Sequence, residues 1–520
     1  MEVESERTKP VAVFMAFGTK GDVYPIAAIA VAFACDQRQY DVVLITHSAH
    51  ENLRCHLAEK HVSYRPISSP PVLSIHQKHD PTGSVELPFS LQKRMFSSEH
   101  RQECYLVVES IFGSGPSMEG DFIVINFFAL EGWSFAELFR VRCMVAAPYV
   151  VPYSAPSSFE RHFKKELPLL YKYLKEADIS KVCWKDVIHW MWPLFTEYWG
   201  SWRCDNLNMS PCPFTDPVTG LPTWHDRPPS PLLLYGFSKE VVECPGYWPS
   251  KVRVCGFWFL PNEWQFSCKQ CCEISRIVSS GHLYTKDELC SAHVHLDFFL
   301  KTPMPMPPVF IGLSSIVSHC MCSMGFLKNP QAFLRLLQTV MEITGYRFIL
   351  FTAGYMPLDT AIRAIVAESS SYVMHKQFND ECLSLFNDRL FCFSGTIPYK
   401  WLFTRCAAAI HHGGSGTTAA ALLAGIPQVV CPFLLDQFYW AERMFWLGVA
   451  PEPLKRSHLL PEESDEKIIQ GAANLLSRVI HDALSPEIRE HAVEISKRIS
   501  LEDGVSNAVK YIKEEIGCSS

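Results

Sequence analysis

The sequence lacks several features that would assign it to other protein classes. It has no run of about 18 or more apolar residues, which excludes a membrane-spanning helix. The first residues, MEVESERTKP, are charged and have no secretory apolar core. The net charge is −7, which argues against nucleic acid as the partner. The 20 cysteines are scattered, so we expect a cytoplasmic protein with reduced thiols, and contact with a membrane surface stays open.

The bulk composition is that of a folded protein larger than one core. The chain has 520 residues, of which 48% are hydrophobic and 12% aromatic. This apolar content is well above that of disordered chains. The length suits two domains.

The most informative segment is 407–437, AAAIHHGGSGTTAAALLAGIPQVVCPFLLDQ. The apolar runs at 407–410 and 427–431 do not alternate with polar residues, as is typical of parallel strands covered on both faces. A glycine-rich turn follows the first run and opens a helix over 416–424, where backbone N–H groups lack partners and the helix dipole is positive. Glycines let a ligand approach that backbone closely. The turn therefore predicts an anion site, best suited to a diphosphate, built from His412, Gly413, Gly414, Ser415, Gly416, Thr417 and Thr418.

The turn also has a purely structural interpretation, in which the glycines only make a tight bend and both histidines pack. Asp436 and Gln437, one strand later, favour the ligand site, because parallel strands deliver both segments to the same sheet edge. His411 is expected to be structural, since neighbouring residues at a strand end point in opposite directions.

The chain begins with a second strand–turn–helix pattern. An apolar strand over 11–17 leads into Gly18-Thr19-Lys20-Gly21-Asp22, and a helix is predicted from Pro25 to Asp36. Further strands at 41–47 and 62–66 alternate with helices, which predicts a doubly wound parallel sheet. By position alone, Asp22 is a carboxylate that stabilises a helix dipole. A Rossmann oxidoreductase is disfavoured, because no third glycine follows Gly21 and no second-strand acid is well placed for ribose.

Two motifs carry a resemblance to a known family. The block HHGGSGTT with A-G-x-P and P-F-x-x-D-Q-x-x-W, together with GTKGDV near the start, resembles UDP-glycosyltransferases, and most of all their sterol 3-beta-glucosyltransferase branch. The resemblance implies an α/β fold of the GT-B type, with two doubly wound Rossmann-like domains that face each other across a cleft. It also implies an enzyme that transfers a hexose.

The resemblance implies that the chain is divided into four parts. Residues 1–260 would bind the acceptor, 307–500 the UDP-sugar, and the last helix, within 501–520, would return to the first domain. Residues 261–306 would be a linker with an insertion that contains Cys268, Cys271, Cys272, Cys290, His282, His293 and His295. The second half of a zinc motif is poorly formed there, so a solvent-exposed insert is expected.

The resemblance also implies residue roles. Asp22 would be the base, in a loop with Gly18, Thr19 and Gly21. Ser315 and the Ile397 backbone would contact the nucleotide, while His412 and the 413–418 turn would stabilise the diphosphate. Asp436 and Gln437 would bind sugar hydroxyls. Single attack would invert the anomeric centre to a β-glycoside, with UDP-glucose or a related UDP-sugar as co-substrate and with no cofactor and no essential metal.

The acceptor is the most open part of the prediction. A sterol fits the branch, and a triterpenoid or another small lipophilic alcohol is the alternative. The tryptophans within 154–230 could line an apolar acceptor site or simply pack onto the sheet. Ser314, Tyr399 and Lys400 depart from the family pattern of Gly, His and Asp, which leaves open a non-catalytic nucleotide-sugar-binding protein.

Overall fold

A computed structural model describes most of the chain, in two compact units. The described residues are 7–71, 89–113, 118–150, 157–176, 191–216, 218–219, 231–244, 251–265, 291–313, 327–368, 376–379, 382–395, 397–434 and 436–517. The first unit contains the described residues up to Phe259 together with Asp503 onwards, and the second contains those from Leu260 to Glu502. No helix in the described ranges is long and apolar enough to cross a membrane.

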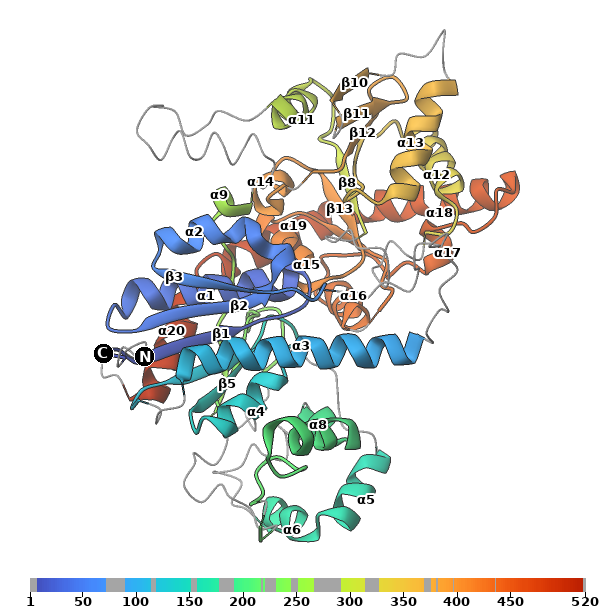
Figure 1. The fold of residues 1–520 in the computed structure, drawn as a ribbon. Helices are drawn as coiled ribbons and strands as arrows, with labels where there is room; N and C mark the ends of the chain where they lie inside the picture. Colours follow the sequence, from blue (N-terminus) through green and yellow to red (C-terminus); the bar gives the residue numbers. More distant parts are fainter. Residues whose placement is uncertain are drawn as a thin grey trace. The chain divides into compact units, whose positions relative to one another are not determined.

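The first unit is built on a seven-stranded, wholly parallel sheet (Figure 1). The strand order is β3-β2-β1-β4-β5-β6-β7. The strands are β1 (Val11–Met15), β2 (Asp41–His47), β3 (Val62–Ile67), β4 (Phe122–Ile125), β5 (Arg142–Ala147), β6 (Leu233–Tyr235) and β7 (Val252–Val254). Strands β1 and β4 are buried throughout, as expected for strands with helices on both faces. The prediction of a doubly wound sheet is confirmed.

The helices of this unit follow the predicted alternation, with one changed boundary. They are α1 (Lys20–Asp36), η1 (Ser48–Leu53), α2 (Arg54–Glu59), α3 (Phe89–Phe112), α4 (Glu131–Leu138), α5 (Ser157–Glu166), α6 (Pro168–Glu176), η2 (Trp192–Phe195), α8 (Glu197–Leu207) and α20 (Gly504–Ile516). The prediction that the first helix begins at Pro25 is wrong, because α1 begins at Lys20. Thr19 and Asp22 form a capping box that starts the helix a turn earlier, with Pro25 inside it.

The C-terminal helix α20 packs on α1 within the first unit, although it is last in the sequence (Figure 1). The Trp258 indole donates a hydrogen bond to the Gly504 carbonyl at 3.1 Å, and the Asn507 amide donates to the Cys255 carbonyl at 2.9 Å. Lys513 pairs with Asp36 of α1 at 2.9 Å. A side chain at Gly504 would meet the Gly256 carbonyl at 2.5 Å, so this helix start needs glycine.

The second unit also has a seven-stranded sheet, ordered β10-β11-β12-β9-β8-β13-β14. Its strands are β8 (Val309–Gly312), β9 (Phe348–Phe351), β10 (Lys376–Asn379), β11 (Cys382–Leu385), β12 (Leu390–Phe393), β13 (Ala408–His411) and β14 (Gln428–Val430). Strands β8, β9, β12, β13 and β14 are parallel, whereas β11 runs antiparallel to β10 and β12. The sequence patterns did not predict β10 and β11, which are only four residues each.

Three helices of the second unit begin at side-chain caps that accept a hydrogen bond. The helices of this unit are α9 (Asn262–Gln265), α11 (Ser291–Lys301), α12 (Pro330–Thr344), α13 (Met356–Glu368), α14 (Tyr399–Phe403), α15 (Ser415–Ala424), α16 (Gln437–Trp446), α17 (Arg456–Leu459), α18 (Glu466–Ala483) and α19 (Pro486–Ile499). Asn329, Asp465 and Ser485 each accept a hydrogen bond from the first turn of α12, α18 and α19. Helices α12, α13 and α18 lie together beside the sheet (Figure 1).

Helix α11 differs from the expected solvent-exposed insert. Leu296 and Phe299 are buried, and Phe299 packs on Phe391 of β12. The Arg347 guanidinium lies over the Phe299 ring and donates a hydrogen bond to its carbonyl at 3.1 Å. The C-terminal end of the predicted linker is therefore part of the second unit. Residues 266–290, with the cysteines of the insert, lie outside the described residues.

Candidate functional site

The turn after β13 has a backbone that only glycine accommodates well. Gly413 has φ +85°, in the left-handed region. A Cβ there would lie 2.9 Å from the Gln437 carbonyl and 2.9 Å from Val430 Cγ1. Gly413 therefore lets the turn lie directly against the start of α16.

His411 holds this turn in place through two hydrogen bonds of its ring. Its Nδ1 accepts a hydrogen bond from Gly413 N at 3.0 Å, so its Nε2 carries the proton and donates to Gln428 Oε1 at 2.8 Å. The ring is fully buried, and burial lowers the pKa of His411 to about 3. His411 is thus a neutral, structural residue of the β13–β14 pair, as the alternation at the strand end predicts.

His412 has a different environment from its neighbour. Its side chain is half-buried, and Nδ1 has no hydrogen-bond partner among the described residues. Burial lowers its pKa to about 4, an effect that the Gly312 backbone offsets in part. A Cβ on Gly414 would lie 2.5 Å from His412 Nε2, so Gly414 makes room for the ring. At neutral pH His412 is a neutral imidazole with one N–H donor.

The first turn of α15 presents backbone donors next to these side chains. Ser415 is half-buried and Gly416 exposed, with Gly414 as the N-cap residue. Thr417 is 7% exposed. Thr418 is fully buried, and its hydroxyl has no partner among the described residues. A ligand at this turn would therefore meet the N–H groups of Ser415, Gly416 and Thr417 before it met the Thr418 side chain.

Asp436 and Gln437 lie at the start of α16, beside the same turn. The Trp440 indole donates a hydrogen bond to Asp436 Oδ2 at 3.0 Å, and Trp440 is fully buried. Gln437 Oε1 accepts from the backbone of Phe433 at 2.9 Å and of Leu434 at 3.0 Å. These contacts fix both side chains. The side-chain oxygen of Gln437 bonds the backbone of the loop that precedes α16. Any contribution of Gln437 to a ligand would come from its amide nitrogen.

The remaining predicted nucleotide contacts are described in part. Ile397 is 5% exposed and precedes α14. In α14, the Tyr399 ring stacks on Phe403 at 4.9 Å and meets Phe310 at 5.3 Å. Tyr399 therefore has a packing role in the second unit. Ser314 and Ser315 lie outside the described residues.

In the first unit, the loop after β1 closes on its own carboxylate. Thr19 N donates to Asp22 Oδ2 at 2.7 Å. Gly18 has φ +102°, and a Cβ there would lie 2.7 Å from that oxygen. Burial raises the pKa of Asp22 to about 6, although its bonds to Thr19 act in the opposite direction. Burial also lowers the pKa of Lys20 to about 8.

Two residues that the sequence analysis missed fix this loop. The Asn126 side chain donates to the Phe17 carbonyl at 2.8 Å and accepts from Phe17 N at 3.2 Å. The His50 ring bonds the Gly18 carbonyl through Nε2 at 3.0 Å, so that nitrogen carries the proton. Asn126 directly follows buried β4, and this polar residue at a strand end was a signal that could have been used.

The chain is similar in sequence to known glycosyltransferases. Residues 388–494 match the family described as "Erythromycin biosynthesis protein CIII-like, C-terminal domain". The chain is 24% identical over 497 residues to the sterol 3-beta-glucosyltransferase UGT80B1 of Arabidopsis thaliana, covering 95% of this chain and 66% of that protein. It is 25% identical to the sterol 3-beta-glucosyltransferase of Saccharomyces cerevisiae, covering 96% of this chain and 35% of that protein. The chain thus spans less than two thirds of these relatives.

Solved structures show the same fold at low sequence identity. The UDP-glucose: anthocyanidin 3-O-glucosyltransferase in complex with UDP matches 98% of this chain and 100% of its own, with TM-score 0.55 and 13% identity. The calicheamicin glycosyltransferase CalG4 matches 99% and 100%, with TM-score 0.54 and 14% identity. Together the comparisons confirm the resemblance carried by the two motifs: the chain has the GT-B fold and is a relative of the sterol glucosyltransferase branch of UDP-glycosyltransferases.

Proposed function

We propose that the protein transfers glucose from UDP-glucose to a hydroxyl of a sterol or similar lipophilic alcohol, with inversion to a β-glycoside. The observation that carries this proposal is the turn at 412–417, where helix-terminal N–H groups and a neutral imidazole lie together at the carboxyl end of the parallel strand β13. Such a donor set suits the growing negative charge on a departing diphosphate. It supplies hydrogen bonds without a metal ion, and we propose that none is required for transfer.

Asp22 is the base in this proposal. Its pKa of about 6 leaves it mostly ionised at neutral pH and still basic enough to accept a hydroxyl proton. The acceptor oxygen attacks the anomeric carbon as Asp22 takes its proton, and the bond from that carbon to the UDP oxygen breaks. Asn126 and His50 act by holding the loop that carries Asp22, and not by contact with the reacting atoms.

Sugar recognition falls to Asp436 and Gln437. The Trp440 indole fixes the orientation of the Asp436 carboxylate, which would accept from a sugar hydroxyl. A polar side chain held in this way discriminates strongly, because a sugar that leaves it unpaired loses binding.

The sterol assignment is supported by relatives whose names carry that activity. A terpene cyclase-glycosyl transferase fusion protein of Humicola fuscoatra is 37% identical over 220 residues, covering 42% of this chain and 14% of that protein. Because of this similarity, we propose a terpenoid alcohol as the second acceptor class. Trp199 and Trp202, 8% and 7% exposed, enclose the Arg101 guanidinium, so these two tryptophans favour the packing role over the acceptor wall. Trp184 and Trp190 lie outside the described residues. A peripheral contact with membranes would give access to such acceptors.

The test is UDP release by the purified full chain with UDP-glucose and a panel of sterols and triterpenoid alcohols. We expect acceptor-dependent release that continues in EDTA and needs no added Mg²⁺ or Mn²⁺. Release with the triterpenoid alcohols alone would show that the acceptor belongs to that class and is not a sterol. UDP-glucose binding without release for any acceptor would overturn the transferase proposal in favour of a nucleotide-sugar-binding protein.

A further inference from the structure

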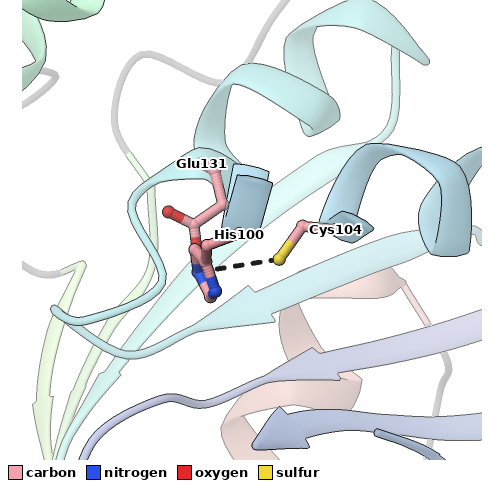
Figure 2. A group of neighbouring side chains, drawn as sticks. All are labelled: His100, Cys104 and Glu131. Atoms are coloured by element: carbon pink, nitrogen blue, oxygen red, sulfur yellow. Dashed lines mark hydrogen bonds and ion pairs between the residues drawn. The ribbon is translucent and has the colours of Figure 1, made fainter. Parts of the chain in front are cut away.

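A second cluster of chemically active side chains lies in the first unit and plays no part in the proposed transfer. His100 and Cys104 lie four residues apart on α3 and so share one helix face. Glu131 stands at the start of α4. Figure 2 shows the three side chains converging, with His100 between the other two.

The distances in this cluster are those of metal ligands. His100 Nε2 lies 3.2 Å from Glu131 Oε1 and 3.7 Å from Cys104 Sγ. Zinc bonds of about 2.0–2.3 Å at tetrahedral angles would separate nitrogen from oxygen by about 3.3 Å and nitrogen from sulfur by about 3.5 Å. All three ligand atoms lie within 4.8 Å of one another. A cation between them would need only small side-chain rotations.

The residues around the cluster give His100 the support that metal-bound histidines usually have. Ser69 Oγ lies 2.6 Å from His100 Nδ1, the nitrogen opposite the proposed metal, and 3.3 Å from His47 Nδ1. Such a hydrogen bond on the far nitrogen fixes the ring and its tautomer. The Phe17 ring packs edge-on against the imidazole, with 4.6 Å between centroids.

The cluster is much more buried than an ordinary surface ion pair. Cys104 is fully buried, and the Glu131 side chain is 4% exposed. The His100 side chain is 16% exposed and gives the route for entry from solvent. The neighbouring Arg101 guanidinium lies 3.5 Å from the centre of the Trp199 ring and is held by that aromatic group. The Arg101 charge also acts on Glu131 and Cys104, while His100 contacts both of these side chains directly.

We infer that His100, Cys104 and Glu131 form a site for a divalent transition metal of the zinc class. Nitrogen, thiolate and carboxylate are all zinc donors, and three protein ligands leave a fourth position for water. The thiol proton would be released to solvent as the sulfur–metal bond forms. Because the cluster joins α3 to α4, the metal would tie these helices together and is separate from the proposed diphosphate chemistry.

The test measures metal directly, on the full chain. Metal-depleted protein would be titrated with Co²⁺, and absorption from thiolate-to-cobalt charge transfer would be followed together with the zinc content of the protein as purified. We expect one site with a thiolate band in the wild type. Cys104→Ser should remove the band and one equivalent of metal, and Glu131→Gln, which keeps the side-chain size, should weaken binding about tenfold or more.

Two controls address the other cysteines of the chain. Cys143→Ser changes a half-buried thiol of β5, and Cys271→Ser changes the cysteine-rich insert. The site assignment requires that both keep the band that Cys104→Ser loses, with circular dichroism showing that each variant is folded. No thiolate band in the wild type would mean a His100–Glu131 ion pair only. A band that survives both Cys104→Ser and Glu131→Gln would also overturn the inference.

Discussion

The two glycine-containing turns of this protein both follow the carboxyl end of a parallel strand and lead into a helix, yet they are built differently. The loop at 18–22 directs its carboxylate to its own backbone, through the bond from Thr19 N to Asp22. The turn at 412–417 gives the N-terminal donors of α15 no side-chain cap, since its N-cap residue is glycine. In the proposed mechanism, one turn carries the base and the other carries the hydrogen-bond donors.

The difference explains why one turn can be interpreted from its residues and the other cannot. Gly413 and Gly414 are required by close approaches to Gln437 and His412, and they belong to a continuous glycine-rich turn whose local chemistry predicts an anion site. Asp22 is equally well explained as part of a capping box. Only the resemblance to a family distinguishes a catalytic carboxylate from a capping one.

The largest effect that separates the two turns is expected at Asp22. Asp22→Asn keeps the hydrogen bond to Thr19 but removes the base, so kcat should fall by about 10²–10⁴ while UDP-glucose binding stays unchanged. Steady-state UDP release and calorimetric titration with UDP-glucose measure the two quantities. Undiminished turnover would leave Asp22 as a capping residue only.

The pH dependence should also differ between the turns. The raised pKa of Asp22, about 6, means that the base is protonated below that pH, so kcat/KM should be level above about pH 7 and fall about tenfold per unit below pH 6. His412 has a pKa of about 4 and stays neutral, so UDP-glucose affinity should be constant from about pH 5 to 8. Rate and affinity that fall together with pH would contradict this separation.

Gly413→Ala should damage the donor turn. The new Cβ would meet the Gln437 carbonyl and Val430 at 2.9 Å in a backbone with φ +85°, and the strain should cost about 1–3 kcal/mol and weaken UDP-glucose binding. Gly345→Ala is the matched control, because Gly345 has φ +74° with nothing within 4 Å of its Cβ. Chemical denaturation and titration of both variants would separate backbone strain from crowding. Equal effects on UDP-glucose binding would show that crowding at Gly413 is unimportant.

A smaller effect is expected from Gly414→Ala. Gly414 has φ −62°, so the backbone tolerates alanine, but the Cβ would lie 2.5 Å from His412 Nε2 and displace the ring. We expect a loss of up to about tenfold in UDP-glucose affinity, the value of one hydrogen bond, with little change in stability. Gly471→Ala, where a Cβ meets nothing within 4 Å, is the control and should leave affinity unaltered. Full affinity in Gly414→Ala would remove His412 from the donor set.

Much of the fold could be predicted from the sequence because its parallel strands are continuous apolar runs, as at β1, β4 and β13. Helix boundaries were harder where side-chain caps decided them, as at Thr19. The strands β10 and β11 were too short to give a pattern. The cluster of His100, Cys104 and Glu131 could not be predicted, because it depends on contacts between residues that are distant in sequence.

The same limit applies within the candidate site. The glycines and threonines of 412–418 form one continuous segment, so local chemistry identifies them. The support comes from Asn126 after β4 and from His50 in η1, and it becomes apparent only when the fold brings them to Phe17 and Gly18.

The most direct test of the division between the two turns is to measure UDP-glucose binding and sterol-dependent UDP release together, in Asp22→Asn and Gly413→Ala. We expect that Asp22→Asn binds UDP-glucose like the wild type but barely releases UDP, and that Gly413→Ala binds UDP-glucose weakly. Loss of binding in Asp22→Asn, or full binding in Gly413→Ala, would contradict the assignment of the base to one turn and of the diphosphate to the other.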